Sequence, residues 1–184
     1  MNSCPWGLNK ANLAKFHEEE WGRPVHDDNK LFEFLSLSVL AAGLSYETVL
    51  DKRDDLRLAF HDFEIDEVAQ MSTEEIEGLL RNKRIIRNKK KMSAVVCNAR
   101  VSREIRANGQ TLDDFFWSYT GFRTIDNKWL HAEMIPEQTL LSKKISDDMR
   151  ERGFIMVGPV LIYSFLETVG IVNDHLIDCR TRIS

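Results

Sequence analysis

The chain has few cysteines and no long apolar run, and both absences exclude classes of protein. Three cysteines, Cys4, Cys97 and Cys179, occur in 184 residues, and such an odd, sparse count is a poor disulfide framework. No stretch approaches the roughly 20 apolar residues that a membrane span needs. The segment from Met1 to Lys10 also lacks the basic start and apolar run of a secretion signal. We therefore expect a cytoplasmic protein without a membrane segment.

A general excess of basic residues is lacking as well. The net charge is −4 and the isoelectric point is near 5.8, which argues against nucleic-acid binding by the whole surface, although a local basic patch suffices for it. One dense basic run is present, and it comprises Arg81, Lys83, Arg84, Arg87, Lys89, Lys90 and Lys91. This run is either a solvated helix face or a set of contacts to phosphates.

The apolar residues that are present recur at helical spacing, as in Met92, Val95, Val96 and Ala99. Leu31–Ala42 and Val160–Val169 are apolar almost all round, which predicts two centrally buried helices. A shorter helix is expected over Asn12–Glu20. No alternating strand pair is evident, so we predict one all-α domain over residues 1–184, with Cys97 as a buried thiol in a core helix.

Four potential metal ligands are divided between the two ends of the chain. Cys4 and His17 lie near the start, and His175 and Cys179 are four residues apart near the end. On a helix, that spacing would place the last two side chains on one face. Two thiolates and two imidazoles form a tetrahedral zinc set and favour zinc over calcium or magnesium. Spacing alone leaves open that these are unrelated thiols and ordinary histidines.

A glycine-bounded turn separates two predicted helices in the last third of the chain. Thr139–Arg152 has a helical pattern, the segment from Gly153 to Gly158 follows, and Pro159 suits the first turn of a second helix. Glycines permit close approach to a phosphate, and free amides at a helix start can bind an anion. The pattern fits a helix-hairpin-helix motif or a plain antiparallel helix pair. The preceding segment, 120–137, is predicted to be a long loop.

Short motifs follow one another in order along nearly the whole chain. They are Cys4, Trp6 and His17–Gly22; Ala42–Ser45, Thr48–Leu50 and Lys52-Arg53; Ile85–Arg87, Lys91, Asn98-Ala99 and Trp117-Ser118; and Arg152–Phe154, Val157-Gly158, Tyr163–Phe165 and Gly170–His175. Together they resemble the DNA-3-methyladenine glycosylase I family. The resemblance implies a helix-hairpin-helix glycosylase that cuts the N-glycosidic bond of 3-methyladenine in double-stranded DNA and leaves an abasic site.

The resemblance also implies roles for individual residues. A structural zinc would be held by Cys4, His17, His175 and Cys179. DNA contacts are expected from Gly43, Leu44, Ser45, Arg87, Lys91, Gly153, Gly158 and Ser164. Leu44 would be a wedge into the gap left by the extruded base, unless it is ordinary core packing. Trp6, Trp21 and Tyr46 would surround the base, although aromatic residues in a helical protein are more often core.

Asn173 occupies the place of the catalytic Asp found in other helix-hairpin-helix glycosylases, so it is either a catalytic-site residue or a helix cap. The other departures from the family concern the base pocket. Ser38 stands where a Glu is expected, Ala41 replaces a Gln, Tyr46 replaces a Trp, and Leu13 and Phe16 replace two tyrosines. A hydroxyl cannot attract a cationic base as a buried carboxylate does.

Two functions remain after these observations. The first is a monomeric N-glycosylase for an alkylated purine, with weak or shifted activity in an electrically neutral pocket. The second is a protein that binds damaged DNA without excising a base. Ser38 is the residue that separates them, because it replaces the carboxylate with which the family would select a cationic base.

Overall fold

The structure is a computed structural model, and it describes residues 4–8 and 10–182. The first half contains η1 (Pro5–Leu8), α1 (Ala11–Glu19), α2 (Asp28–Ala41), α3 (Tyr46–Leu50), α4 (Arg53–Ala59), η2 (His61–Phe63), α5 (Ile65–Gln70) and α6 (Thr73–Leu79). The second half contains α7 (Lys89–Ala107), α8 (Leu112–Trp117), η3 (Ser118–Thr120), β1 (Ile125–Asp126), η4 (Ala132–Met134), α9 (Leu140–Glu151), α10 (Pro159–Thr168) and β2 (Val172–Asn173). The predicted helices are therefore confirmed.

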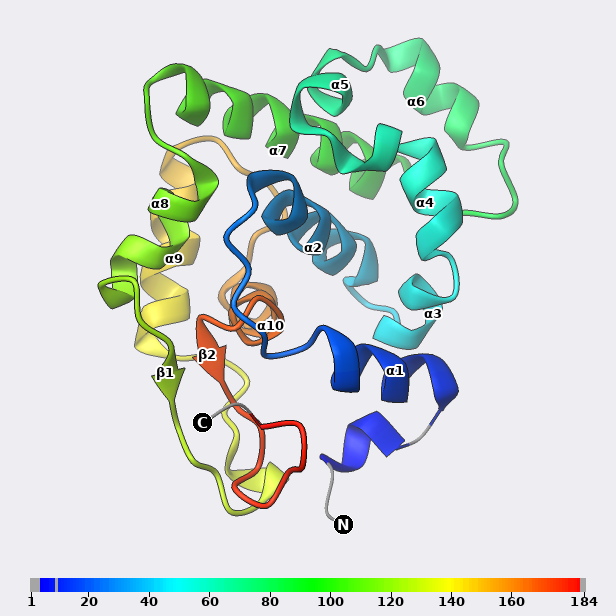
Figure 1. The fold of residues 1–184 in the computed structure, drawn as a ribbon. Coiled ribbons are helices and arrows are strands. Elements are labelled where there is room, and N and C mark those ends of the chain that lie inside the picture. Colours follow the sequence, from blue (N-terminus) through cyan, green and yellow to red (C-terminus); the bar gives the residue numbers. More distant parts are fainter. Residues whose placement is uncertain (1–3, 9, 183–184) are drawn as a thin grey trace.

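Helix α2 lies at the centre of the fold, with α7 across one side and α10 on another (Figure 1). Asp27 begins the helix by accepting a hydrogen bond from the backbone N–H of Lys30. Every residue from 31 to 40 is buried, which agrees with the apolar pattern of this segment. Burial of each Leu or Phe side chain adds about 1.5–3 kcal/mol to the free energy of unfolding. This helix therefore anchors the core around which the site is built.

The predicted hairpin between α9 and α10 is confirmed as a helix pair that packs together. Its turn is held from two neighbouring helices. The side-chain amide of Asn98 on α7 donates to the carbonyl of Ile155 and accepts from its N–H at 3.1 and 2.9 Å. Ser146 on α9 donates to the carbonyl of Val157 at 2.6 Å. Met156 between them has a positive φ of 59°, so the turn is a defined conformation rather than a loose connection.

The structure corrects three expectations. Two short strands are present, and β1 pairs with β2 in parallel although they are far apart in sequence. His175 and Cys179 are not on a helix; the chain beyond β2 forms turns, because α10 ends at Thr168 and β2 redirects the chain. Cys97 is half-buried rather than a core thiol, since its sulfur faces the carbonyl of Gly153 at 3.8 Å beside the hairpin turn.

The two ends of the described chain meet at one side of the molecule, where η1 and α1 lie beside the segment that follows β2 (Figure 1). No helix among the described residues is long and apolar enough to cross a membrane.

Candidate functional site

The two ends of the chain bring four potential metal ligands into one cluster. Cys4, His17, His175 and Cys179 are all buried, and their ligand atoms lie within 4.8 Å of one another. Sγ of Cys4 is 3.8 Å from Nδ1 of His175, and Sγ of Cys179 is 3.5 Å from Nε2 of His17. Tetrahedral zinc with ordinary bond lengths separates a sulfur and a nitrogen ligand by roughly 3.5 Å. The cluster therefore has the composition and size to hold a metal ion.

The surroundings of the cluster orient its ligands. Nε2 of His175 lies 3.1 Å from the carbonyl of Trp21, so a proton on Nε2 leaves Nδ1 as the lone-pair atom that faces the thiols. Gly22, with a φ of +75°, packs so closely that an added Cβ would lie 2.8 Å from Nε2 of His175. An added Cβ on Gly7 would likewise lie 2.8 Å from the ring of His17. Both glycines are thus required by the position of a histidine ring of the cluster.

Burial shapes the acid–base behaviour of this cluster. It raises the pKa of Cys4 to about 12, and burial together with the charge of His175 lowers the pKa of His17 to about 4. Burial also lowers the pKa of His175, so at neutral pH both imidazoles favour the neutral form that ligates a metal. The Cys4 thiolate, in contrast, needs a neighbouring cation to form, and a bound metal supplies one.

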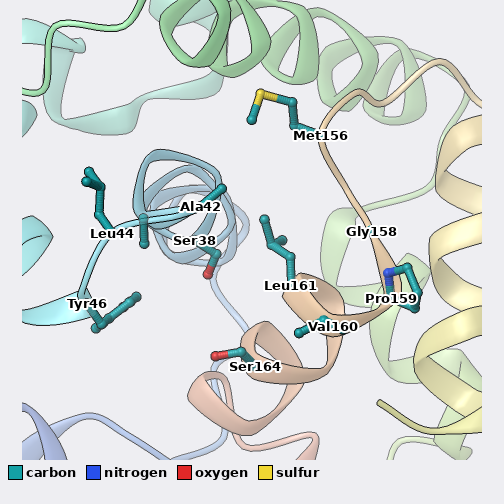
Figure 2. A pocket seen from close by; sticks show the side chains of 11 residues that line it. Ser38, Ala42, Leu44, Tyr46, Met156, Gly158, Pro159, Val160, Leu161 and Ser164 are labelled. Atoms are coloured by element: carbon teal, nitrogen blue, oxygen red, sulfur yellow. The ribbon is translucent and has the colours of Figure 1, made fainter. Parts of the chain in front are cut away.

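A first cavity of about 610 Å³ opens between the end of α2, the hairpin turn and the start of α10. Its lining residues are Ser38, Ala41, Ala42, Leu44, Tyr46, Met156, Gly158, Pro159, Val160, Leu161 and Ser164. Figure 2 shows Ser38 of α2 and Ser164 of α10 among side chains that otherwise carry no polar atom, apart from Tyr46. No carboxylate of the described residues lines this cavity, in agreement with the neutral pocket expected from the sequence.

Ser38 contributes little polarity even here. It is buried, and its hydroxyl donates to the carbonyl of Phe34 one turn earlier on α2 at 2.9 Å. Leu44 stands at the mouth of the same cavity and is 45% exposed, so the alternative of ordinary core packing is wrong. The preceding Gly43 has a φ of +73° with open space around it, and Ser45 caps α3 by accepting from the N–H of Thr48.

A second cavity of about 410 Å³ adjoins the first, because Tyr46 and Ser164 line both. It contains the other aromatic residues that the sequence assigns to the base. Its lining residues are Trp6, Leu13, Phe16, Trp21, Tyr46, Ala132, Ile135, Pro136, Glu137, Ser164, Glu167 and Thr168. We refer to the two adjacent cavities together as the cleft, and the predicted long loop supplies part of the wall of the second one. The expected base-binding residues are thus divided between a cavity beside Ser38 and a cavity beside Glu167.

Glu167 is a residue of this cleft that the sequence analysis missed. Burial, followed by the charge of Asp174 and a hydrogen bond to it, raises the pKa of Glu167 well above its usual range. Its position three residues after Ser164 on the same helix face was the signal that could have revealed it. Asp174 is fully buried and accepts hydrogen bonds from Asn127, Trp129 and Tyr163.

Asn173 lies in β2 and is buried, so the expectation of a helix cap is wrong. Its side-chain oxygen accepts from the backbone N–H of His175 at 3.2 Å. It is not among the described residues that line either cavity. The structure therefore places it beside a potential metal ligand and apart from the cleft.

The basic run before α7 is exposed over most of its length, but Lys91 is an exception. Lys91 is 7% exposed, and its ammonium donates to the carbonyl of Leu40 at the end of α2. We therefore correct its placement on the exposed basic face, because tertiary packing uses the charge to cap a core helix. Arg87 remains exposed, and in the described part of the chain no ion pair engages it, whereas Arg84 and Lys89 have acidic partners.

A buried ion-pair cluster supports the cleft from behind. Arg53 pairs with both Glu20 and Glu33, and Glu33 also accepts from Lys30 and Arg57. Although burial works against it, hydrogen bonds from these three cations lower the pKa of Glu33 to about 2. The guanidinium of Arg53 lies over the ring of Phe34, which contacts the cleft residue Phe16. The wall of the cleft is thus tied to α1, α2 and α4.

A mostly helical fold, a helical hairpin beside an aromatic cleft and a Cys/His cluster that joins the chain ends together define the class of the helical DNA glycosylases. The family model described as methyladenine glycosylase matches residues 6–182. The chain therefore belongs to the methyladenine glycosylase family.

Individual relatives extend over almost the whole chain. A DNA-3-methyladenine glycosylase of Haemophilus influenzae is 36% identical and covers 98% of each chain. DNA-3-methyladenine glycosylase 1 of Escherichia coli is 37% identical over 97% of this chain and 96% of its own. A structure of 3-methyladenine DNA glycosylase I from Staphylococcus aureus, solved to explain 3-methyladenine recognition, is 33% identical, with a TM-score of 0.96 over 100% of this chain and 98% of that one.

Proposed function

We propose that this protein is a DNA N-glycosylase that removes an alkylated purine of the 3-methyladenine class from double-stranded DNA. The observation that carries this proposal is the composite cleft beside the hairpin in a chain of this family. The relatives are named for the same activity. The cleft has the volume for a base. Trp6, Phe16 and Trp21 line it and offer ring faces on which a base can stack.

Three elements around the cleft would hold the DNA. The hairpin turn, bounded by Gly153 and Gly158, presents backbone amides to a phosphate. Arg87, exposed before α7, contributes an unengaged positive charge. Leu44, exposed at the cavity mouth, enters the duplex where the base has left. The extruded base would then enter the first cavity beside Leu44 and reach Trp6 and Trp21 in the second cavity.

The reaction is a hydrolysis. The bond between C1′ of the deoxyribose and the purine nitrogen breaks, and its electron pair goes to the ring. A water oxygen forms the new bond to C1′, and the water releases one proton. Because an N3-alkylated adenine carries positive charge while attached to the sugar, it leaves as a neutral base. It is a good leaving group, so positioning in the cleft supplies much of what catalysis needs.

We propose that excision of 3-methyladenine itself is slow. Ser38 replaces the expected carboxylate, and its hydroxyl is already used by Phe34. The loss of a charge-assisted hydrogen bond costs about 1.5–3 kcal/mol, or one to two decades in rate. The same observation favours the second candidate function, binding of damaged DNA without excision.

We also propose that the terminal cluster holds zinc. Two sulfurs and two imidazole nitrogens at these separations fit this ion. Four protein ligands leave no position for a reactive water, so the ion would be structural. It would join the first and last segments of the chain and add its binding energy to folding. A monomer in the cytoplasm, associated with the nucleoid while on DNA, completes the proposal.

Base release from alkylated duplex DNA tests the function. We expect free 3-alkyladenine and abasic sites to accumulate slowly, as separated by chromatography and by cleavage of the abasic strand. Tight duplex binding without release of any base would instead support the second candidate. Absence of both binding and release would refute both.

A further inference from the structure

We infer that Glu167 is a specificity-determining residue of the base cleft, and that it takes over from position 38 the polar contact to the purine. This inference rests on the proposed function and names the group that reads the base. Its substrate class is an alkylated purine with an exocyclic amine, as in adenine, in preference to one with a carbonyl oxygen at that position, as in guanine.

The cavity around Glu167 is built for a flat aromatic ligand. Glu167 lines it together with Trp6, Phe16 and Trp21, whose rings supply stacking surfaces. Trp6 and Trp21 are fixed edge to face with centroids 5.0 Å apart. Ser164, one turn earlier on α10, and Tyr46 connect this cavity to the first one. Two carboxyl groups line this cavity, and Glu167 is the one on α10, whereas Glu137 lies on the exposed loop.

The carboxyl of Glu167 is held in place by a buried acceptor. It hydrogen-bonds to Asp174, which is fully buried and fixed by donors on three other residues. Burial raises the pKa of Glu167 well above its usual range, and with or without a proton its carboxyl retains an oxygen that accepts a hydrogen bond.

A hydrogen-bond acceptor at this position distinguishes two kinds of purine edge. The exocyclic amine of adenine donates a hydrogen bond to such an oxygen, whereas the O6 atom of guanine is itself an acceptor.

Binding of the free bases to the metal-replete protein tests the inference without DNA or cleavage. Calorimetry with 3-methyladenine and 3-methylguanine would compare the parent with Glu167→Leu and Glu167→Gln. We expect Glu167→Leu to weaken 3-methyladenine binding about tenfold and to bring the ratio of the two affinities close to one. Glu167→Gln keeps an acceptor oxygen and can donate to Asp174, so it should bind within about threefold of the parent.

Glu133→Leu is the matched control, because Glu133 lies on the same loop, is exposed and lines neither cavity. It should bind both bases as the parent does. If Glu167→Leu fails to fold, Glu167→Met tests the same loss of the acceptor in a flexible apolar side chain. Unchanged preference for adenine in a folded apolar variant, or no binding of 3-methyladenine by the parent, would overturn the inference.

The two proposals fail separately. Purine binding that depends on Glu167, in a protein that releases no base from DNA, would refute the glycosylase function alone. Base release that is insensitive to Glu167→Leu would refute the role of Glu167 alone.

Discussion

The terminal Cys/His cluster and the base cleft are neighbours that share aromatic residues, and they differ in how closely they follow their family. The ring of Trp6 packs edge to face on that of His17 with centroids 5.2 Å apart, and the rings of Trp21 and His175 have centroids 4.6 Å apart. Both tryptophans also line the second cavity. The cluster has every ligand that the resemblance implies. The cleft contains Ser38, Ala41 and the other positions at which the resemblance implies departures from the family.

If the implied departures hold, the frame of the cleft and its chemical lining vary independently. A metal bound at the cluster would fix the two histidines against which the tryptophan rings pack, and so would position those rings. The polar groups come from other elements, α2 and α10, whose outward faces accept substitution without loss of the core. Perturbing the cluster should therefore affect stability and base binding together, whereas perturbing the lining should affect base recognition alone.

The largest effect is expected from breaking the cluster. Cys179→Ser should lose the bound metal and part of the roughly 10–16 kcal/mol that structural zinc contributes in small domains. It should also weaken purine binding, because the rings of Trp6 and Trp21 lose their support. Elemental analysis and thermal unfolding measure the first result. Cys97→Ser, which alters a half-buried thiol outside the cluster, is the control and should retain the metal and stability. An unchanged melting temperature in Cys179→Ser would disprove that a metal bound at this cluster stabilises the fold.

The next largest effect concerns the ion pairs behind the cleft. Glu33→Gln should cost about 3–5 kcal/mol at neutral pH, because it leaves Arg53 buried with one partner fewer. The folded pKa of Glu33 is about 2, against an ordinary value of 4.5. Its stabilisation is therefore complete above about pH 4.5 and lost as the pH falls towards 2.

Urea unfolding of the parent and Glu33→Gln at pH 7 and pH 3 measures this dependence. The gap in unfolding free energy between the two should shrink at pH 3, and effects of acid on the metal cluster cancel because both proteins contain it. Glu74→Gln, at an exposed position, should match the parent at both values. A difference in unfolding free energy that stays constant with pH would contradict the lowered pKa of Glu33.

A change in the lining should affect recognition with little effect on the frame. Ser38→Glu should raise excision of 3-methyladenine by one to two decades, as about 1.5–3 kcal/mol of charge-assisted hydrogen bonding returns. Ser38→Gln fills the same space without a charge and should give much less. Single-turnover base release with saturating protein is the measurement. Equal rates for the two variants would mean that charge at this position does not govern excision.

The smallest effect is expected on the DNA-facing surface. Arg87→Glu should weaken duplex binding and reduce the slope of log affinity against log salt by about one or more, because one phosphate contact is lost. Arg103→Glu makes the same charge change on an exposed residue towards the other end of α7. It should have a smaller effect. If the two variants bind alike at every salt concentration, Arg87 is not a specific contact.

Local chemistry in the sequence determined most of the fold. The helical spacing of apolar residues, the capping box of Ser72 and the proline at the start of α10 each depend on neighbours within a few positions. The four potential metal ligands were recognisable as residue types that suit one ion and match one family. The hairpin was evident for the same reason, since glycine and proline limit the backbone wherever they occur.

Tertiary structure alone decided which of these side chains face one another. Lys91 belongs to a basic run by sequence, yet packing against α2 buries it on the carbonyl of Leu40. The segment from His175 to Cys179 has helical spacing, but the pairing of β2 with β1 redirects it into turns. Glu167 and Asp174 become a pair only because β2 returns beside α10. Burial and the contacts between distant side chains depend on distances across the fold, and no local pattern in the sequence records them.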